Sequence, residues 1–287
     1  MATAEEIAKF NKDGYLICDN FLDADEVATL RKQCQHIVED MNPKEHAPTV
    51  FSTIKQTDND YFMNSGDNIS FFFEAGAVND KGELLVEKHK SLNKIGHALH
   101  ELDPEFKRVT YKKKIHDICR GLSFKKPVIV QSMYIFKQPG IGGIVTPHQD
   151  ATFLHTDPLK LTGFWIALED CTLKNGCLQF VPGSHKDELV TQMVRNDDGK
   201  GVHFIKPADL VKEKYGDRFI PAEVKAGTLV VIDAKSVHMS EPNKSEKSRH
   251  IYTFHIAESQ DTVWSKRNWL QPTEALPFPE LYAGKEQ

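Results

Sequence analysis

The chain has 287 residues, 40% of them hydrophobic and 27% charged, and its formal net charge is -5. These values are typical of a globular protein that is long enough to bury a substantial core. The acidic balance argues against a nucleic-acid-binding surface, and no stretch is apolar for long enough to span a membrane.

The N-terminal part predicts two helices with a strand between them. Residues 3–6 and 23–26 have the spacing of capping boxes, each with Thr or Asp three residues before Glu. We therefore expect a short helix that ends at Gly14 and a longer one that ends before Pro43. The apolar residues 15–18 predict a strand between these helices.

The next part of the chain is less regular. Residues 44–68 are polar and rich in turn formers, and residues 69–73 form a short segment rich in Phe that predicts a strand. The spacing of apolar residues predicts helices over residues 91–99 and 104–122.

A basic run lies within the second of these helices. Its members are Lys107, Arg108, Lys112, Lys113 and Lys114. Such a run could bind an anion, but the solvated face of a helix is the more common reason for it, and we favour that interpretation.

From Pro127 onward the pattern changes to short strands separated by turn signals. The expected strands are residues 128–136, 163–168, 177–181, 228–233 and 251–256. Strands that follow a helical half predict a mainly β fold, a barrel or double-sheet jelly roll with flanking helices packed outside.

The pattern predicts a single domain over residues 1–287. We expect a helical part over about 1–126 and a barrel core over about 127–258. Residues of about 186–222 are charged and weakly patterned, so we expect an insertion across the surface or mouth of the barrel.

The cysteines and the chain ends bear on location. Five cysteines without close pairs do not resemble a disulfide framework, so a reducing compartment is expected. The N-terminal residues lack the basic and apolar regions of a signal peptide, and the last residues are not of the Ser-Lys-Leu type. We therefore expect a cytoplasmic protein.

Two histidines and a carboxylate form a candidate metal site. His148 and Asp150 stand two residues apart, so in a strand their side chains would point to the same face, although Pro147 and the glycines before it indicate a strand end or loop. His238 follows the expected strand 228–233. This donor set is the facial triad of non-haem Fe(II) oxygenases, which leaves positions on the iron open. Each residue alone is more often an ordinary surface or core side chain, and the combination favours the metal site.

A serine and an arginine follow His238 across an expected turn. By strand alternation Ser240 faces the same side as His238, and Arg249 would begin the returning strand of an antiparallel hairpin. A guanidinium placed there can bind a carboxylate through two parallel hydrogen bonds. The arginine therefore favours an iron enzyme that uses a keto-acid co-substrate.

Motifs along almost the whole chain, from about Phe10 to Tyr282, resemble the phytanoyl-CoA dioxygenase family. They are Asp13-Gly-Tyr-Leu16, Pro147-His-Gln-Asp150, Trp165-Ile-Ala-Leu-Glu-Asp170, Asn175-Gly-Cys-Leu178, Val181-Pro-Gly-Ser-His185 and the block from His238 to Arg249.

The resemblance implies a double-stranded β-helix, a jelly-roll barrel of the cupin-like type, with Fe(II) at its open end. His148, Asp150 and His238 match the family's iron ligands, through which catalysis would run. Arg249 and Ser240 match the pair that binds the distal carboxylate of the co-substrate 2-oxoglutarate.

Trp165, Met133 and Lys94 match further co-substrate positions of the family. As alternatives, Trp165 and Met133 would be core residues of the barrel, and Lys94 would be a solvated side chain on the helix expected over 91–99. Two other histidines are expected to be structural, with His185 in a turn and His255 packed on a strand.

The expected function is that of a 2-oxoglutarate-dependent dioxygenase, which uses O₂ to hydroxylate a small-molecule or acyl-type substrate and releases succinate and CO₂. A metal-bearing jelly roll that only binds or senses a ligand stays open as an alternative. A cupin-like enzyme without a keto acid is a third, although Arg249 and Ser240 would then have no task. The expected partner is a small molecule, with neither nucleic acid nor membrane, and no feature indicates an oligomeric state.

Overall fold

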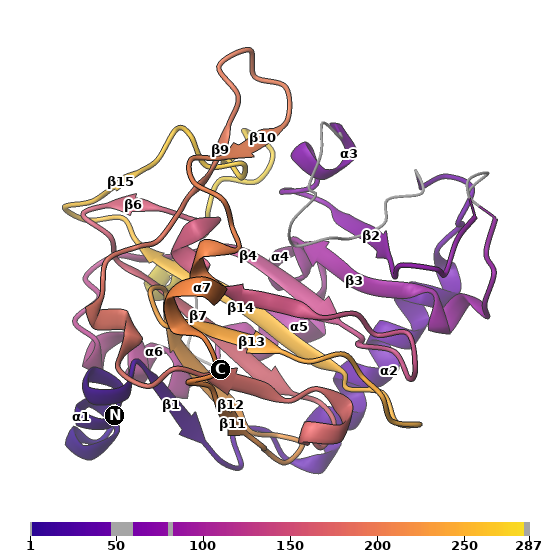
Figure 1. The fold of residues 1–287 in the computed structure, drawn as a ribbon, viewed down its shortest axis with the longest axis horizontal. Coiled ribbons are helices and arrows are strands. Elements are labelled where there is room, and N and C mark those ends of the chain that lie inside the picture. The colour runs from indigo at the N-terminus through magenta and orange to yellow at the C-terminus, as the bar shows by residue number, and fades with distance from the viewer. Residues whose placement is uncertain (1, 47–59, 80–82, 284–287) are drawn as a thin grey trace.

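A computed structural model describes residues 2–46, 60–79 and 83–283 (Figure 1). In this part of the chain the largest element is an antiparallel sheet of seven strands, in the order β1-β12-β7-β14-β4-β3-β2. These strands are β1 (Tyr15–Cys18), β12 (Leu229–Asp233), β7 (Leu161–Ala167), β14 (Ile251–Glu258), β4 (Pro127–Ile135), β3 (Leu92–His97) and β2 (Ile69–Phe73).

A smaller antiparallel sheet has the order β11-β8-β13-β5. Its strands are β11 (Ile220–Ala222), β8 (Leu178–Phe180), β13 (His238–Ser240) and β5 (Val145–His148). The two sheets share an apolar cluster that includes Trp165 and Ile232 from the large sheet and Phe180 from the small one. Two sheets around one core form the jelly roll that the sequence predicts.

Helices cover the outer face of the large sheet. They are α1 (Ala4–Asp13), α2 (Ala24–Asp40), α4 (Leu99–Leu102), α5 (Pro104–Thr110) and α6 (Lys113–Gly121). Their apolar faces pack on the strands in the largest core cluster, where Leu30 of α2 and Phe106 of α5 meet Phe164 and Phe254 of the sheet. The expected capping boxes open α1 and α2, and Gly14 ends α1 in the left-handed conformation, with φ of 83°.

The remaining elements are short strands, helices and turns that connect the two sheets and the outer helices. β9 (Met193–Arg195) and β10 (Val202–Phe204) form a hairpin that projects at the top of the view, and β6 (Thr156–Asp157) pairs with β15 (Val263–Trp264) (Figure 1). α3 (Asp60–Met63) and α7 (Leu210–Tyr215) complete the α-helices of the described residues. Short 3₁₀ turns are η1 (Lys88–Lys90), η2 (Asp150–Thr152), η3 (Leu173–Asn175), η4 (Ser184–Lys186) and η5 (Leu281–Ala283).

The expected helix over 91–99 is wrong. Most of that segment is strand β3, which pairs with both β2 and β4. Leu92, Lys94, Ile95, Gly96 and His97 are all buried, so the strand has no polar face and lacks the alternation by which a strand is recognised. Lys94 accordingly lies in a sheet and is not a solvated helix residue.

Two further boundaries differ from the expectation. The helix expected over 104–122 is divided into α5 and α6, because Lys112 has an extended backbone with ψ of 143°. The expected insertion 186–222 ends in β11, which pairs with β8, so its last residues complete the small sheet. Of the turn-rich segment 44–68, residues 47–59 lie outside the described residues.

The expected hairpin between the strands of His238 and Arg249 is also wrong. β13 pairs with β5 and β8, whereas β14 pairs with β4 and β7 in the other sheet. Arg249 precedes β14, and its backbone N–H donates to the carbonyl oxygens of Phe136 and Lys137 at 3.3 Å each. The connection between the two residues therefore crosses from one sheet to the other.

The basic run of α5 and α6 is neutralised by carboxylates. Lys112 and Arg108 pair with Glu26 of α2, Lys114 pairs with Glu6 of α1, and Lys113 pairs with Asp117. Lys107 pairs with Glu101. The run was expected to be the solvated face of one helix; in the structure its members lie on two helices and the residue between them, and they pair with carboxylates of the protein.

All five cysteines are buried and free, as expected. Among the described residues, none of the helices has the length and apolar character needed to cross a membrane.

Candidate metal centre and co-substrate pocket

The structure brings the three predicted ligands together at the open end of the barrel. His148 ends β5, His238 begins β13, and the two face each other in register. Asp150 begins the turn η2, beyond the end of β5 and not on the same strand as His148. The Nε2 atoms of both histidines lie 3.7 Å from Oδ1 of Asp150. The ligand atoms of all three lie within 4.8 Å of one another, so one metal ion fits between them.

Backbone carbonyls orient both imidazoles. Nδ1 of His148 lies 2.8 Å from the carbonyl oxygen of Thr146, and Nδ1 of His238 lies 3.0 Å from that of Ser236. Because a carbonyl only accepts, each Nδ1 carries the proton, and each Nε2 turns its lone pair toward Asp150. This second hydrogen bond is the one that metal-binding histidines usually make.

The charge state of the cluster suits Fe(II). Burial opposes ionisation of Asp150, but His255 and His238 beside it, with a hydrogen bond from His255, hold its pKa well below the usual value. Burial, with His148 close by, lowers the pKa of His238 to about 4. An ionised carboxylate and a neutral imidazole are the forms that bind a divalent metal.

A cavity of about 140 Å³ opens beside the cluster. Five of its lining residues were predicted from the sequence. They are His148, Asp150, Met133, Lys94 and Arg249. Ser240 is buried on β13, two residues beyond His238, and is not in the cavity lining. Trp165 is buried on β7. It is not in the cavity lining, but its ring packs against the guanidinium of Arg249, which is.

Arg249 lies buried in this cavity with only 2% of its surface exposed. Burial lowers the pKa of its guanidinium. Among the described residues it forms no ion pair with a carboxylate, although the charge of Glu169 acts to raise its pKa, and its Nε has no hydrogen-bond acceptor. A buried guanidinium without an anion is costly, so the arrangement indicates that an anionic ligand completes it.

Two buried lysines line the cavity, and burial lowers the pKa of both. Burial lowers the pKa of Lys94 to about 7, and its Nζ lies 3.8 Å from Sδ of Met133 and 4.9 Å from the ring centre of Phe72. Burial, with Arg249 nearby, lowers the pKa of Lys137 to about 6, and its Nζ donates to the carbonyl oxygen of Gly143 at 2.7 Å. Lys137 was not predicted from the sequence.

His255 is a second residue that the sequence analysis missed. It was expected to pack on a strand, and it does lie on β14, but its Nε2 is 3.1 Å from Oδ2 of Asp150. The signal was available, because Arg249, Thr253 and His255 alternate along the chain and therefore share one face. His185, by contrast, lies in the turn η4 and bonds to the carbonyl oxygen of Asn11, as expected.

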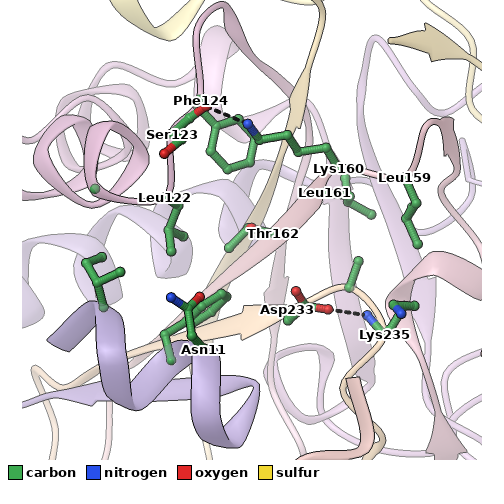
Figure 2. Close-up of a pocket in the computed structure, with 14 residues that line it drawn as sticks. Asn11, Leu122, Ser123, Phe124, Leu159, Lys160, Leu161, Thr162, Asp233 and Lys235 are labelled. Carbon is green, nitrogen blue, oxygen red and sulfur yellow. Dashed lines mark hydrogen bonds between the residues drawn. The ribbon is translucent and has the colours of Figure 1, made fainter. Parts of the chain in front are cut away.

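A larger cavity, of about 280 Å³, lies between α1, the segment 121–124 and the ends of β7 and β12 (Figure 2). It contains none of the predicted site residues, and its charged groups already have partners. Lys160 donates to the carbonyl oxygen of Ser123 at 2.5 Å, and a carboxylate oxygen of Asp233 accepts from the backbone N–H of Lys235 at 2.9 Å. We therefore assign the candidate site to the cavity beside the three ligands.

Residues 10–251 match the model of the family described as "Phytanoyl-CoA dioxygenase (PhyH)". The chain is 53% identical to phytanoyl-CoA dioxygenase domain-containing protein 1 of Danio rerio, over 98% of each chain. It is 45% identical to a phytanoyl-CoA dioxygenase of Arabidopsis thaliana, over 96% of each chain.

The chain belongs to the phytanoyl-CoA dioxygenase family. The family is described as a dioxygenase, which confirms the predicted enzyme class of oxidoreductase.

Solved structures confirm the jelly-roll fold of this family member. The carbocyclase SnoK from nogalamycin biosynthesis matches with a TM-score of 0.66 and 19% identity, over 96% of each chain. EctD from S. alaskensis with 2-oxoglutarate and 5-hydroxyectoine matches with a TM-score of 0.59 and 19% identity, over 90% of this chain and 76% of that one.

Proposed function

We propose that this enzyme hydroxylates a small-molecule or acyl-type substrate in the cavity beside His148, Asp150 and His238, which hold Fe(II). Arg249 binds 2-oxoglutarate with Met133 and Lys94 of the same cavity lining, and the proposal extends to Trp165, which packs on Arg249, and to Ser240 on β13. The observation that carries the proposal is the buried guanidinium of Arg249, which lacks an anion among the described residues and lines the same cavity as His148 and Asp150.

Each group of residues has its own task in this reaction. When bound, the iron supplies the O₂ chemistry that converts 2-oxoglutarate to succinate and CO₂ and hydroxylates the substrate. His148, Asp150 and His238 hold the metal on one side and leave the cavity side open. Arg249 binds the far carboxylate of the co-substrate, and the buried surroundings strengthen that contact because they exclude water.

The wall that faces the cluster favours an apolar reacting group on the substrate. Phe62 and Trp269 stack with ring centres 4.3 Å apart, His97 meets Trp269 edge-on at 4.9 Å, and Phe153 lies 5.8 Å from the ring of His148. The cavity of about 140 Å³ is smaller than the roughly 300–1,000 Å³ of a typical small-molecule site.

The test is a turnover experiment with the metal-loaded protein. We expect succinate formation that requires both Fe(II) and 2-oxoglutarate, and, in a cytosolic metabolite extract, a product heavier than its precursor by one oxygen atom. His148→Ala, which removes a ligand, is the control and should yield neither. Succinate formation at equal rates by wild type and His148→Ala would show that this cavity is not the site of the reaction.

A further inference from the structure

Three side-chain positions on neighbouring strands meet beside Asp150. Gln131 of β4 and Gly163 of β7 flank His255 of β14, each as its direct partner in register. Cross-strand partners point to the same face of a sheet. This row therefore faces the barrel interior next to the predicted metal ligand.

The two carboxylate oxygens of Asp150 have different neighbours. Oδ1 lies 3.7 Å from Nε2 of both His148 and His238, whereas Oδ2 lies 3.1 Å from Nε2 of His255. A carboxylate only accepts, so the hydrogen of this contact is on His255 Nε2. One oxygen thus faces the other ligands and the second is held by His255.

Gln131 fixes the orientation of the His255 ring. Its Nε2 lies 3.3 Å from Nδ1 of His255, and it donates to the lone pair there, so that the ring proton stays on Nε2. Both residues are 5% exposed, which leaves little access for water to replace either contact. A buried hydrogen-bonded chain of this kind holds its members in one arrangement.

Gly163 leaves the space in which this contact forms. A Cβ at this position would lie 3.0 Å from Oδ2 of Asp150 and 3.3 Å from Nε2 of His255. The backbone of Gly163 is not in the left-handed region, so chain conformation does not require glycine there. An added Cβ would instead force the carboxylate or the imidazole to move by a few tenths of an ångström.

Asp150 needs such a partner because its strand has already ended. β5 stops at His148, and Asp150 begins the turn η2. The backbone of the turn is anchored where the N–H of Ala151 donates to the carbonyl oxygen of Ala234 at 2.9 Å. That bond fixes the main chain but not the rotation of the Asp150 carboxylate.

We infer that His255 is a positioning residue, which holds Oδ2 of Asp150 and thereby presents Oδ1 to the metal, with Gln131 and Gly163 as its support. The inference rests on the proposed function, since it takes Asp150 as a metal ligand. Partners of metal ligands in other proteins typically change metal affinity by about 10–100-fold when they are removed.

The experiment measures binding of Co²⁺ to the purified protein, its visible absorption spectrum and the melting temperature, without turnover. We expect His255→Leu to weaken Co²⁺ binding by about 10–100-fold and to change the spectrum. His255→Gln should retain much of the affinity and the spectrum, because the glutamine amide nitrogen can occupy the place of Nε2. His203→Leu is the matched control, since His203 is exposed on β10, and should bind Co²⁺ like wild type.

Gly163→Ala tests the same contact without removing His255. It should also weaken Co²⁺ binding, and it keeps the inference testable if His255→Leu does not fold. Co²⁺ binding of wild-type strength by His255→Leu and Gly163→Ala would overturn the inference. So would an equal loss in His255→Leu and His255→Gln that merely follows a lower melting temperature.

The proposed metal site is tested separately by His148→Ala, which should abolish Co²⁺ binding. Retention of binding by that variant would contradict the proposed function itself. Loss of binding by His148→Ala together with wild-type binding by His255→Leu would contradict only the role of His255.

Discussion

The guanidinium carbon of Arg249 lies 5.4 Å from the centre of the Trp165 ring. Trp165 lies on β7 of the large sheet, and Arg249 lies two residues before β14 of the same sheet. A tryptophan face can hold a guanidinium in place without neutralising it. The arrangement therefore orients Arg249 while its hydrogen-bond donors stay available for a ligand.

Replacement of Arg249 tests its role in co-substrate binding. Truncating one partner of a buried charged contact typically costs about 2–5 kcal/mol, so Arg249→Ala should weaken 2-oxoglutarate binding by roughly 30-fold or more. Metal affinity should change far less, because Arg249 is not a ligand. Calorimetric titrations with the metal and then with 2-oxoglutarate measure both, and Arg218→Ala, at a surface arginine, is the control. Equal co-substrate affinity in wild type and Arg249→Ala would exclude this role.

Lys94 should reduce the stability of the free protein. Its folded pKa of about 7 is below the ordinary value of 10.5 because of burial, so between these pH values the unfolded chain binds more protons. The free energy of unfolding contributed by this group therefore rises with pH over that window. Lys94→Met should remove this pH dependence and raise the melting temperature near neutral pH by a few degrees.

Melting curves across that pH window measure the effect of Lys94. Lys186→Met, at an exposed lysine, is the matched control and should leave both the slope and the melting temperature unchanged. A steeper loss of stability at low pH in Lys94→Met than in wild type would contradict the assigned sign.

Lys137 should take up a proton when a dicarboxylate binds. Burial and the charge of Arg249 lower its pKa to about 6, against the opposing effect of Glu74 and Glu241. An anion in the cavity favours the charged form, so 2-oxoglutarate affinity should fall as pH rises above about 6.

Titration calorimetry in two buffers of different ionisation enthalpy measures the uptake directly. Lys137→Met should lower the number of protons taken up, and Lys244→Met, at an exposed lysine, should not. Unchanged proton uptake in Lys137→Met would contradict the assignment to Lys137. Lys94, the other buried lysine of the cavity lining, would then be the next group to replace.

Gly176 should be required for both stability and the position of Lys137. Its φ is +80°, and a Cβ there would lie 2.4 Å from the carbonyl oxygen of Glu241 and 2.5 Å from Cε of Lys137. We expect Gly176→Ala to destabilise the protein by about 2–4 kcal/mol in urea unfolding. Gly199→Ala separates the two causes, because Gly199 has φ of +76° with nothing within 4 Å of its Cβ. An equal loss of unfolding free energy in Gly199→Ala would show that the contact of an added Cβ with Glu241 and Lys137 contributes nothing.

Much of the barrel and of its ligand set follows from local sequence. The capping boxes and the strands β4, β7, β12 and β14 are where the pattern predicts them, since alternation and turn residues act over a few positions. The sequence left open whether Asp150 shares the strand of His148 or lies at a strand end or loop, and the structure places it in a turn just beyond the strand. The three ligands converge, so the donor chemistry could be predicted although the exact backbone that carries it could not.

The incorrect helix over residues 91–99 has a physical cause, which is burial of the strand on both faces. β3 carries buried residues at successive positions, so its apolar spacing fits a helix equally well. The choice of partner strands was also hidden, because pairing depends on the whole sheet order and not on the turn after Ser240. His255 was missed although it alternates with Arg249 along the chain, because its contact with Asp150 joins residues that are distant in the sequence.

The crossing between β13 and β14 fixes a length. His238 is in the small sheet and Arg249 enters the large one, so the span from metal to guanidinium is set by the spacing of two packed sheets, about 10 Å in general. On the proposed function, the distance between the two sheets selects the length of the keto acid that binds. A dicarboxylate one carbon shorter or longer than 2-oxoglutarate should bind more weakly, since neither sheet can shift without disturbing the core between them.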